Sequence, residues 1–185
     1  MARSLLPARK AAAKQAGLTI IELMIAVVIV GIMASLAAPA MKDMILNARM
    51  SSQTSDLLTD FAFARSQAAN RGQRVTVCAS SNGTSCAAVS WALGRIVFAD
   101  IDADGAVDVG EEILRVVPAM PGTITVVTAG LTDLNRIQFR SSGMTAGLSA
   151  ASATFTLCDD RTGGDFGRLL TVTGTGRTRT AKNNC

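Results

Sequence analysis

The chain has 185 residues, of which 49% are hydrophobic and 17% charged, and it contains no histidine. This length suits one modest domain and an additional segment. Because histidine is absent, Ser-His-Asp and Cys-His catalysis are excluded, together with the commonest zinc ligand. We therefore expect a protein that is not an enzyme.

The basic residues are unevenly distributed. Lys and Arg number 18 against 14 Asp and Glu, and four of the 18 lie within the first 14 positions. From residue 18 onward the chain has 14 basic and 14 acidic groups and is formally neutral. Overall charge therefore gives no argument for nucleic-acid binding, and only a local cluster would do so.

A long apolar stretch follows the basic leader. Residues 23–41, LMIAVVIVGIMASLAAPAM, carry no charge, and as a helix they would extend roughly 28 Å, about one hydrocarbon core. Because basic residues precede the apolar stretch, the positive-inside rule predicts that residues 1–17 lie in the cytoplasm and that the chain beyond about residue 42 is exported. A secretory signal peptide cut near Ala37 and Ala38 is the alternative. Against it, the run exceeds the usual apolar region of ~7–15 residues.

The helical pattern continues beyond the apolar stretch. Within residues 42–72 one stripe recurs at steps near 3.6 and is expected to face a core; its members are Met50, Leu57, Phe61, Ala64 and Ala68. Gly72 is the expected C-cap of this helix.

Short β-branched runs separated by turn residues fill residues 73–185. The predicted strands are Arg74–Ala79, Trp91–Ala99, Ile113–Val117, Ile124–Thr128, Ile137–Arg140, Thr154–Leu157 and Leu169–Val172. Residues 141–153 (SSGMTAGLSAASA) are of low complexity and are expected to form a mobile loop. The predicted fold class is α+β: a long N-terminal helix whose first half is transmembrane, packed on a C-terminal antiparallel β domain.

One acid lies at the start of the apolar run. In lipid the carboxylate of Glu22 would cost roughly 2–3 kcal/mol or more unless it met a partner. Cleavage after Gly17 would free an α-amino group beside the apolar helix. We therefore expect this amine to pair with Glu22 of a neighbouring copy.

The segment Gly17–Met24, GLTIIELM, resembles the type IV prepilin processing motif. The resemblance implies that a prepilin peptidase cuts between Gly17 and Leu18 and methylates the new N-terminus at Leu18. Most members carry Phe where this chain has Leu18. Residues 1–17 would then be the leader peptide, and residues 18–41 the transmembrane and assembly half of the helix.

Further stretches resemble the FimT/FimU/GspH minor pilins and pseudopilins. They are Ala64–Ala68, Arg71–Cys78, Trp91–Asp100, Asp104 and Gly105 with Glu111, Leu114 and Arg115, Phe155–Cys158, and Thr175–Arg179. The resemblance implies a single-pass inner-membrane protein with a periplasmic domain, later incorporated into a pilus at or near its tip, where it would help to initiate or cap pilus assembly. Its partners would be other minor and major pilins, the prepilin peptidase and the inner membrane. A GspH-type minor pseudopilin of a type II secretion system is the alternative.

Four cysteines in an exported domain are expected to be oxidised. Cys78 and Cys86 flank a short turn-rich segment, whereas Cys158 and Cys185 bracket the last strand and the tail. We favour pairing within these two sets, and the sequence leaves the other two connectivities open. A zinc site is the alternative, but the chain has neither CxxC spacing nor histidine.

Residues 100–111, DIDADGAVDVGE, match the ligand positions of a calcium loop. The candidate ligands are Asp100, Asp102, Asp104, Asp108 and Glu111. The loop lies between two predicted strands instead of two helices, so a solvated acidic hairpin is the alternative. Ca²⁺ is the one cofactor that the sequence suggests.

The C-terminal segment has a local excess of basic residues. From residue 167 onward it contains Arg168, Arg177, Arg179 and Lys182 and no acid. A turn at residues 174–176 would present Arg177 and Arg179 on one face of a following extended stretch, in which they are two residues apart. By resemblance, a Gly-Arg-x-Arg motif at this place is associated in FimT-like minor pilins with binding double-stranded DNA during natural transformation. The alternative is that these arginines are solvated or pair with Asp159, Asp160 or Asp165.

Overall fold

The computed structural model describes residue 17, residues 19–133 and residues 135–185. The chain divides into two compact units, and the boundary between them in the sequence lies between Asp43 and Met44. Helix α1 (Ile20–Arg71) runs through both units. Its end agrees with the expected C-cap, since Gly72 follows it with φ of 69°.

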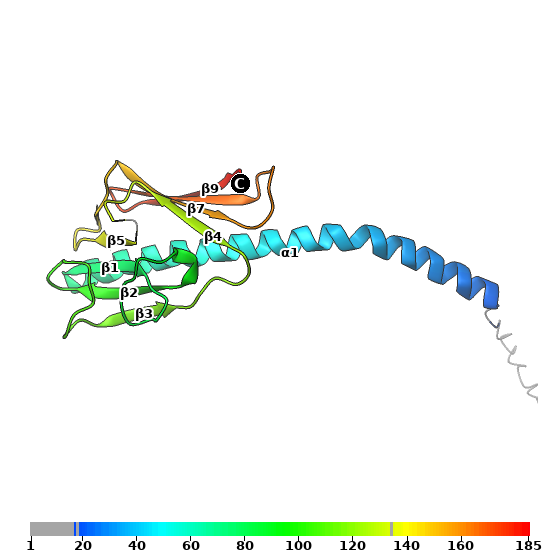
Figure 1. The fold of residues 1–185 in the computed structure, drawn as a ribbon, viewed down its shortest axis with the longest axis horizontal. Helices are drawn as coiled ribbons and strands as arrows, with labels where there is room; N and C mark the ends of the chain where they lie inside the picture. Colours follow the sequence, from blue (N-terminus) through cyan, green and yellow to red (C-terminus); the bar gives the residue numbers. More distant parts are fainter. Residues whose placement is uncertain (1–16, 18, 134) are drawn as a thin grey trace, which may run out of the picture. The chain divides into compact units, whose positions relative to one another are not determined.

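The second unit contains two antiparallel sheets (Figure 1). One has the order β3-β2-β1-β5-β6 and the other the order β4-β7-β8-β9. The first consists of β1 (Arg74–Ala79), β2 (Arg95–Asp100), β3 (Ile113–Val117), β5 (Arg136–Phe139) and β6 (Thr145–Ala146). The second consists of β4 (Thr125–Ala129), β7 (Ser152–Cys158), β8 (Gly167–Thr173) and β9 (Thr178–Asn183). The predicted α+β class is confirmed.

Helix α1 supplies the core stripe that joins the two sheets. The predicted stripe is confirmed, because Met50, Leu57, Phe61, Ala64 and Ala68 are all buried in one cluster with side chains from both sheets. The Phe61 ring lies at the centre, with its centroid 6.3 Å from that of Phe139 on β5 and 4.9 Å from that of Phe155 on β7. The ring of Trp91, in the short 3-10 helix η1 (Trp91–Leu93), approaches the Phe61 ring at 6.1 Å.

A buried ion pair accompanies this aromatic cluster. Asp60 on α1 is 3% exposed and Arg95 on β2 is 1% exposed, and Arg95 Nε donates to Asp60 Oδ2 at 2.6 Å. Arg115 Nη1 on β3 donates to the other carboxylate oxygen at 2.9 Å. One carboxylate of the helix therefore compensates two arginines of the first sheet.

Two sequence expectations need correction. The predicted strand at residues 91–99 begins later, because Trp91–Leu93 forms η1 and β2 starts at Arg95. The segment expected to be a loop, residues 141–153, contains β6 and the first residues of β7. Its small side chains allow backbone pairing: Thr132 N donates to Gly147 O at 2.8 Å and Ser149 N to Gly130 O at 2.9 Å. The stretch after residue 176, which we expected to be extended, is a full strand, β9, and pairs with β8.

We predict that Asp60→Asn strongly destabilises the second unit, because it leaves the guanidinium of Arg95 buried without a counter-charge. Removal of one member of a buried pair costs about 3–5 kcal/mol. Asp56→Asn is the matched control, since Asp56 lies one turn earlier on α1 and is exposed; we expect a change within about 0.5 kcal/mol. Urea unfolding of the full chain in non-ionic detergent, followed by the fluorescence of the single Trp, measures both. Equal midpoints for the two variants would contradict a structural role for the ion pair.

Candidate functional site

The helix begins directly after the predicted processing site. Thr19 Oγ1 accepts a hydrogen bond from the backbone N of Glu22 at 3.3 Å, which caps the first turn. Gly17 is exposed, whereas Leu18 lies outside the described residues. Glu22 is the acid of the first turn of α1, and its side chain is exposed.

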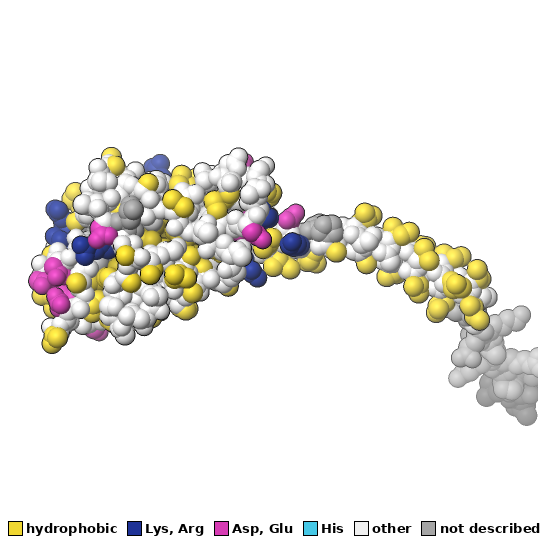
Figure 2. Space-filling view, viewed as in Figure 1, with side chains coloured by type: hydrophobic (Ala, Val, Ile, Leu, Met, Phe, Trp, Pro, Cys, Tyr) yellow, Lys and Arg dark blue, Asp and Glu magenta, His cyan; other side chains and the backbone are white. Residues whose placement is uncertain are grey.

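The part of α1 within the first unit presents apolar side chains to its surroundings. Large apolar residues from Ile20 to Leu36 are 47–81% exposed, and this helix is long and apolar enough to cross a membrane. Figure 2 shows the hydrophobic side chains covering it. An uncovered apolar helix of this length requires lipid or other helices around it.

Two disulfides connect the cysteines in the pairs that we favoured. Cys78 of β1 is bonded to Cys86, and Cys158 of β7 is bonded to Cys185. The second pair joins the end of β7 to the residues that follow β9, so that the C-terminal edge strand is held at both of its ends.

The structure brings three of the five candidate calcium ligands together. One carboxylate oxygen from each of Asp100, Asp102 and Asp104 lies within 4.8 Å of the others. Asp108 and Glu111 are not in this group among the described residues. Instead, Glu111 accepts hydrogen bonds from the backbone N of Ile101 at 2.7 Å and of Asp108 at 3.2 Å, which closes the loop.

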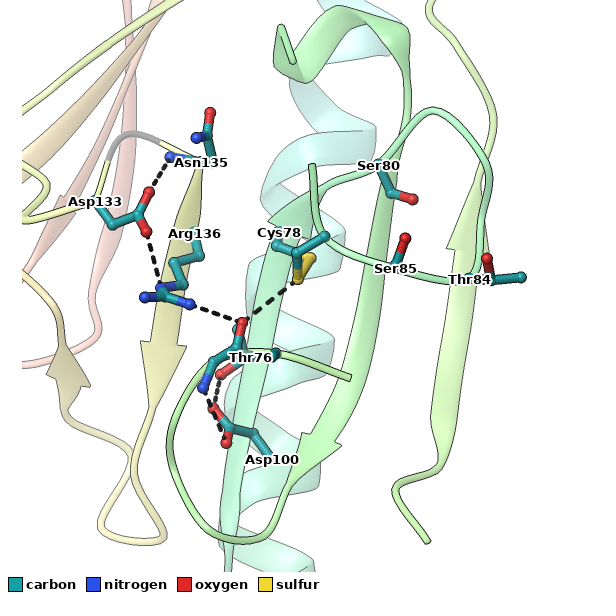
Figure 3. Close-up of a disulfide and its surroundings, with 12 residues drawn as sticks. Thr76, Cys78, Ser80, Thr84, Ser85, Asp100, Asp133, Asn135 and Arg136 are labelled. Carbon is teal, nitrogen blue, oxygen red and sulfur yellow. Dashed lines mark hydrogen bonds and ion pairs between the residues drawn. A yellow bond between two sulfur atoms is a disulfide. The ribbon is translucent and has the colours of Figure 1, made fainter. Parts of the chain in front are cut away.

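Protein groups already engage the buried member of the acidic cluster (Figure 3). Asp100 Oδ2 accepts hydrogen bonds from Thr76 Oγ1 at 2.5 Å and from Gln138 Nε2 at 2.8 Å. Arg136 Nη1 donates to the carbonyl of Gly105 at 3.0 Å. A Cβ at Gly105 would stand 2.8 Å from this guanidinium, and the residue has φ of 77°. The loop therefore requires glycine there.

The hairpin of β8 and β9 carries the predicted basic motif. Arg179 is paired with Thr171 across the two strands, and Arg177 O accepts from Thr173 N at 2.9 Å. Both arginine side chains are exposed. They line a groove of about 710 Å³, the outer-face groove, formed by Thr171, Thr173, Thr175, Arg177, Arg179, Thr180 and Ala181.

Arg168 and Lys182 lie on the opposite face of the same hairpin. They are directly paired and share the side-chain direction of the buried residues Leu170 and Val172, since directions alternate along a strand. Arg168 Nη1 also donates to the carbonyl of Gly167 at 2.9 Å. The four basic residues grouped from the sequence are therefore two pairs on two faces.

The acids suggested as partners of Arg177 and Arg179 form no ion pair with them among the described residues. Asp159 is bound by Arg161, whose Nη2 donates to Oδ2 at 2.7 Å. This side-chain hydrogen bond from Arg161 lowers the pKa of Asp159 below its usual value. In the part of the chain that the structure describes, neither Arg177 nor Arg179 forms an ion pair with a carboxylate.

Comparison with known proteins explains this combination of an apolar helix and a two-sheet unit. A family model described as type II transport protein GspH matches residues 53–176. The chain belongs to the GspH family. The model of the prokaryotic N-terminal methylation motif matches residues 12–38, so the chain is a minor pilin or minor pseudopilin of the GspH/FimT/FimU group, as its sequence indicated.

Solved structures of GspH-like proteins share the fold. The type IV minor pilin FimU of Pseudomonas aeruginosa PAO1 is similar with a TM-score of 0.55 and 20% identity, over 71% of this chain and 87% of that chain. The minor pseudopilin EpsH from the type 2 secretion system of Vibrio cholerae has a TM-score of 0.51 and 10% identity, over 72% and 97%. No curated protein sequence matches the chain.

Sequence reasoning missed one basic residue of this GspH-family unit. Arg65 on α1 lies 111 positions before Gly176, and its Nη1 donates to the carbonyl of Gly176 at 3.2 Å, in the turn between β8 and β9. Its place on the helix, between the core residues Ala64 and Ala68, gave no signal of this contact.

Calcium binding stays a sequence-based prediction. We expect isothermal titration of the full chain in detergent to show Ca²⁺ binding that Asp104→Asn weakens, because that change removes a carboxylate charge from the cluster. Asp43→Asn, outside the loop, is the control. No heat at millimolar Ca²⁺ would mean that the loop is a solvated acidic turn, in which Arg74 and Arg136 already contact the backbone at 3.4 Å and 3.0 Å.

Proposed function

We propose that this chain is a minor subunit of a type IV pilus, with a structural and not a catalytic role. The observation that carries this proposal is the exposed apolar part of α1, which bears a single acid, Glu22, in its first turn. Membership of the GspH family and the methylation motif support it.

The proposed maturation begins at the cytoplasmic side of the inner membrane. The leader, residues 1–17, stays inside, and a prepilin peptidase cuts between Gly17 and Leu18 and methylates Leu18. Residues 18–41 cross the membrane and later leave it for a bundle of similar helices. The periplasm then holds residues 42–72 and the β domain, residues 73–185. They remain there until the subunit is assembled into a pilus at or near its tip.

Glu22 sets the register of assembly in this proposal. A carboxylate in an apolar helix bundle is stable when it meets an opposite charge. The new α-amino group of an adjacent pilin supplies that charge only when the two helices are correctly aligned. Small residues such as Gly31, Ala34 and Ala37 allow close helix contact in place of lipid.

The second candidate is a minor pseudopilin of a type II secretion system. The name of the matched family and the likeness to EpsH favour it. The neighbouring genes distinguish the two, because other minor pilin genes support the pilus and secretion-channel genes support the pseudopilin. A deletion strain that loses surface fibres but continues to secrete proteins would favour the pilus.

We predict that Glu22→Ala leaves membrane insertion and processing intact and reduces incorporation into fibres several-fold, because alignment is lost. N-terminal sequencing of the membrane fraction should read methylated Leu18 in both wild type and variant. The amount of the subunit in fibres sheared from the cells measures its incorporation. Ser35→Ala on the same helix is the control. Equal incorporation of Glu22→Ala and wild type would contradict the pairing, whereas a start at Met1 would contradict the maturation.

The outer-face groove supports a further role, contact with double-stranded DNA. Arg177 and Arg179 project from one face without a carboxylate partner among the residues described, beside threonine hydroxyls. Guanidinium groups suit phosphate because their planar fork donates two hydrogen bonds. Since none of the described residues that line the groove is aromatic, we propose contacts to the DNA backbone that do not depend on base sequence.

We predict that the double variant Arg177→Gln/Arg179→Gln weakens binding to a duplex and flattens its salt dependence by about 2 in log K against log salt. The control is Arg168→Gln/Lys182→Gln, which removes the same charge from the opposite face of the same hairpin and should change the slope less. Fluorescence anisotropy of the full chain in non-ionic detergent measures both. Equal losses in the two double variants would show that net charge, and not this face, attracts the DNA.

A further inference from the structure

The arginines of the second unit differ in their partners. Several of those on and around the first sheet are paired with acids, for example Arg71 with Glu112 at 2.6 Å and Arg136 with Asp133 at 3.1 Å. Around the tip of the β8–β9 hairpin the pattern is different. Four arginines there have no carboxylate partner among the residues that the structure describes: Arg65, Arg140, Arg177 and Arg179.

The chain segments that form this region contain no acid. Residues 61–71 of α1, residues 134–158 and residues 166–185 have neither Asp nor Glu. The excess of positive charge is therefore a property of the folded surface, since three segments far apart in sequence meet there. A local surface of one sign attracts a polyanion even when the whole chain is nearly neutral.

Arg65 and the segment of residues 140–145 contact the hairpin tip. Besides the bond from Arg65 to Gly176, Thr145 N donates to Gly174 O at 3.1 Å, and Thr145 Oγ1 donates to Thr173 O at 3.0 Å. A Cβ at Gly176 would overlap the carbonyl oxygen of Gly143. The close approach of these two turns therefore requires glycine at position 176.

Two grooves lie beside the tip in addition to the outer-face groove. The first, about 410 Å³, is lined by Arg65 with the hydroxyl residues Ser66, Ser142 and Thr178. The second, about 560 Å³, is lined by Arg140 and shares Thr173 and Thr175 with the outer-face groove. Basic and hydroxyl side chains thus continue from the outer face of the sheet, past the tip, to the side of α1.

We propose that Arg65 and Arg140 bind backbone phosphates of the same duplex that Arg177 and Arg179 contact, so that the DNA surface extends around the hairpin tip. This inference rests on the DNA role proposed above. Arg65 uses one N–H for Gly176, which leaves further donors of its guanidinium for a phosphate oxygen. No side-chain hydrogen bond of Arg140 to a described residue is found, and its side chain is exposed.

The experiment measures the affinity of the full chain in non-ionic detergent for a fluorescent 30-base-pair duplex between about 0.05 and 0.3 M salt. One lost phosphate contact reduces the slope of log K against log salt by about 0.9, which corresponds to about eightfold weaker binding at 0.1 M. We expect this loss for Arg65→Gln and for Arg140→Gln, and roughly the product of both losses in the double variant. Arg71→Gln is the matched control, because it removes an arginine of the same helix that is paired with Glu112.

Two further variants separate charge from architecture. Arg65→Lys retains the charge and loses the planar fork, so it should keep most of the salt slope if Arg65 attracts phosphate. If Arg65 only holds the hairpin, Arg65→Lys should weaken DNA binding as much as Arg65→Gln does. In that case Arg140→Gln should leave the affinity and the salt slope unchanged. The inference would be overturned if the Arg65→Gln/Arg140→Gln double variant bound DNA with wild-type affinity and salt slope while Arg177→Gln/Arg179→Gln bound it more weakly. That result would leave the DNA role intact. Absence of binding by the wild type would overturn both.

Discussion

One turn of α1 holds the second unit together. Phe61 packs against aromatic rings from both sheets, and the neighbouring Asp60 binds Arg95 and Arg115 of the first sheet. The apolar contact stabilises by burial, whereas the buried carboxylate fixes which way the helix must face, because any rotation would leave Arg95 uncompensated. The β8–β9 hairpin is positioned by the same helix one turn later, through Arg65.

Local patterns predicted much of this fold. The 3.6-residue stripe identified the buried face of α1, and β-branched runs identified most strands, because both signals depend on residues close in sequence. The cysteine pairs were favoured for the same reason, since each pair brackets a short or terminal segment. Prediction failed for β6, and it gave β9 only as an extended stretch and not as a strand. Small or charged side chains give both a weak strand signal, and both form through backbone bonds to partners elsewhere in the chain.

The candidate site shows a different limit of sequence reasoning. The Arg177 and Arg179 motif is local and can be read from the sequence, but the contact from Arg65 spans 111 positions and has no sequence signal. In the same way, sequence grouped Arg168 and Lys182 with the motif, and only the strand register places them on the other face. The acidic loop matched a ligand pattern by spacing, although Glu111 uses its oxygens to close the loop.

The disulfide between Cys158 and Cys185 has a mechanical consequence. An edge strand that is pulled from its free end separates from its neighbour one hydrogen bond at a time, but β9 ends in a covalent tie to the strand beyond β8. Tension on the arginines of the hairpin is thus carried into a closed covalent ring that includes β8 and β9. In a subunit with this ring, a pulling force from a large polymer bound to β9 would not separate β9 from β8 starting at the C-terminus.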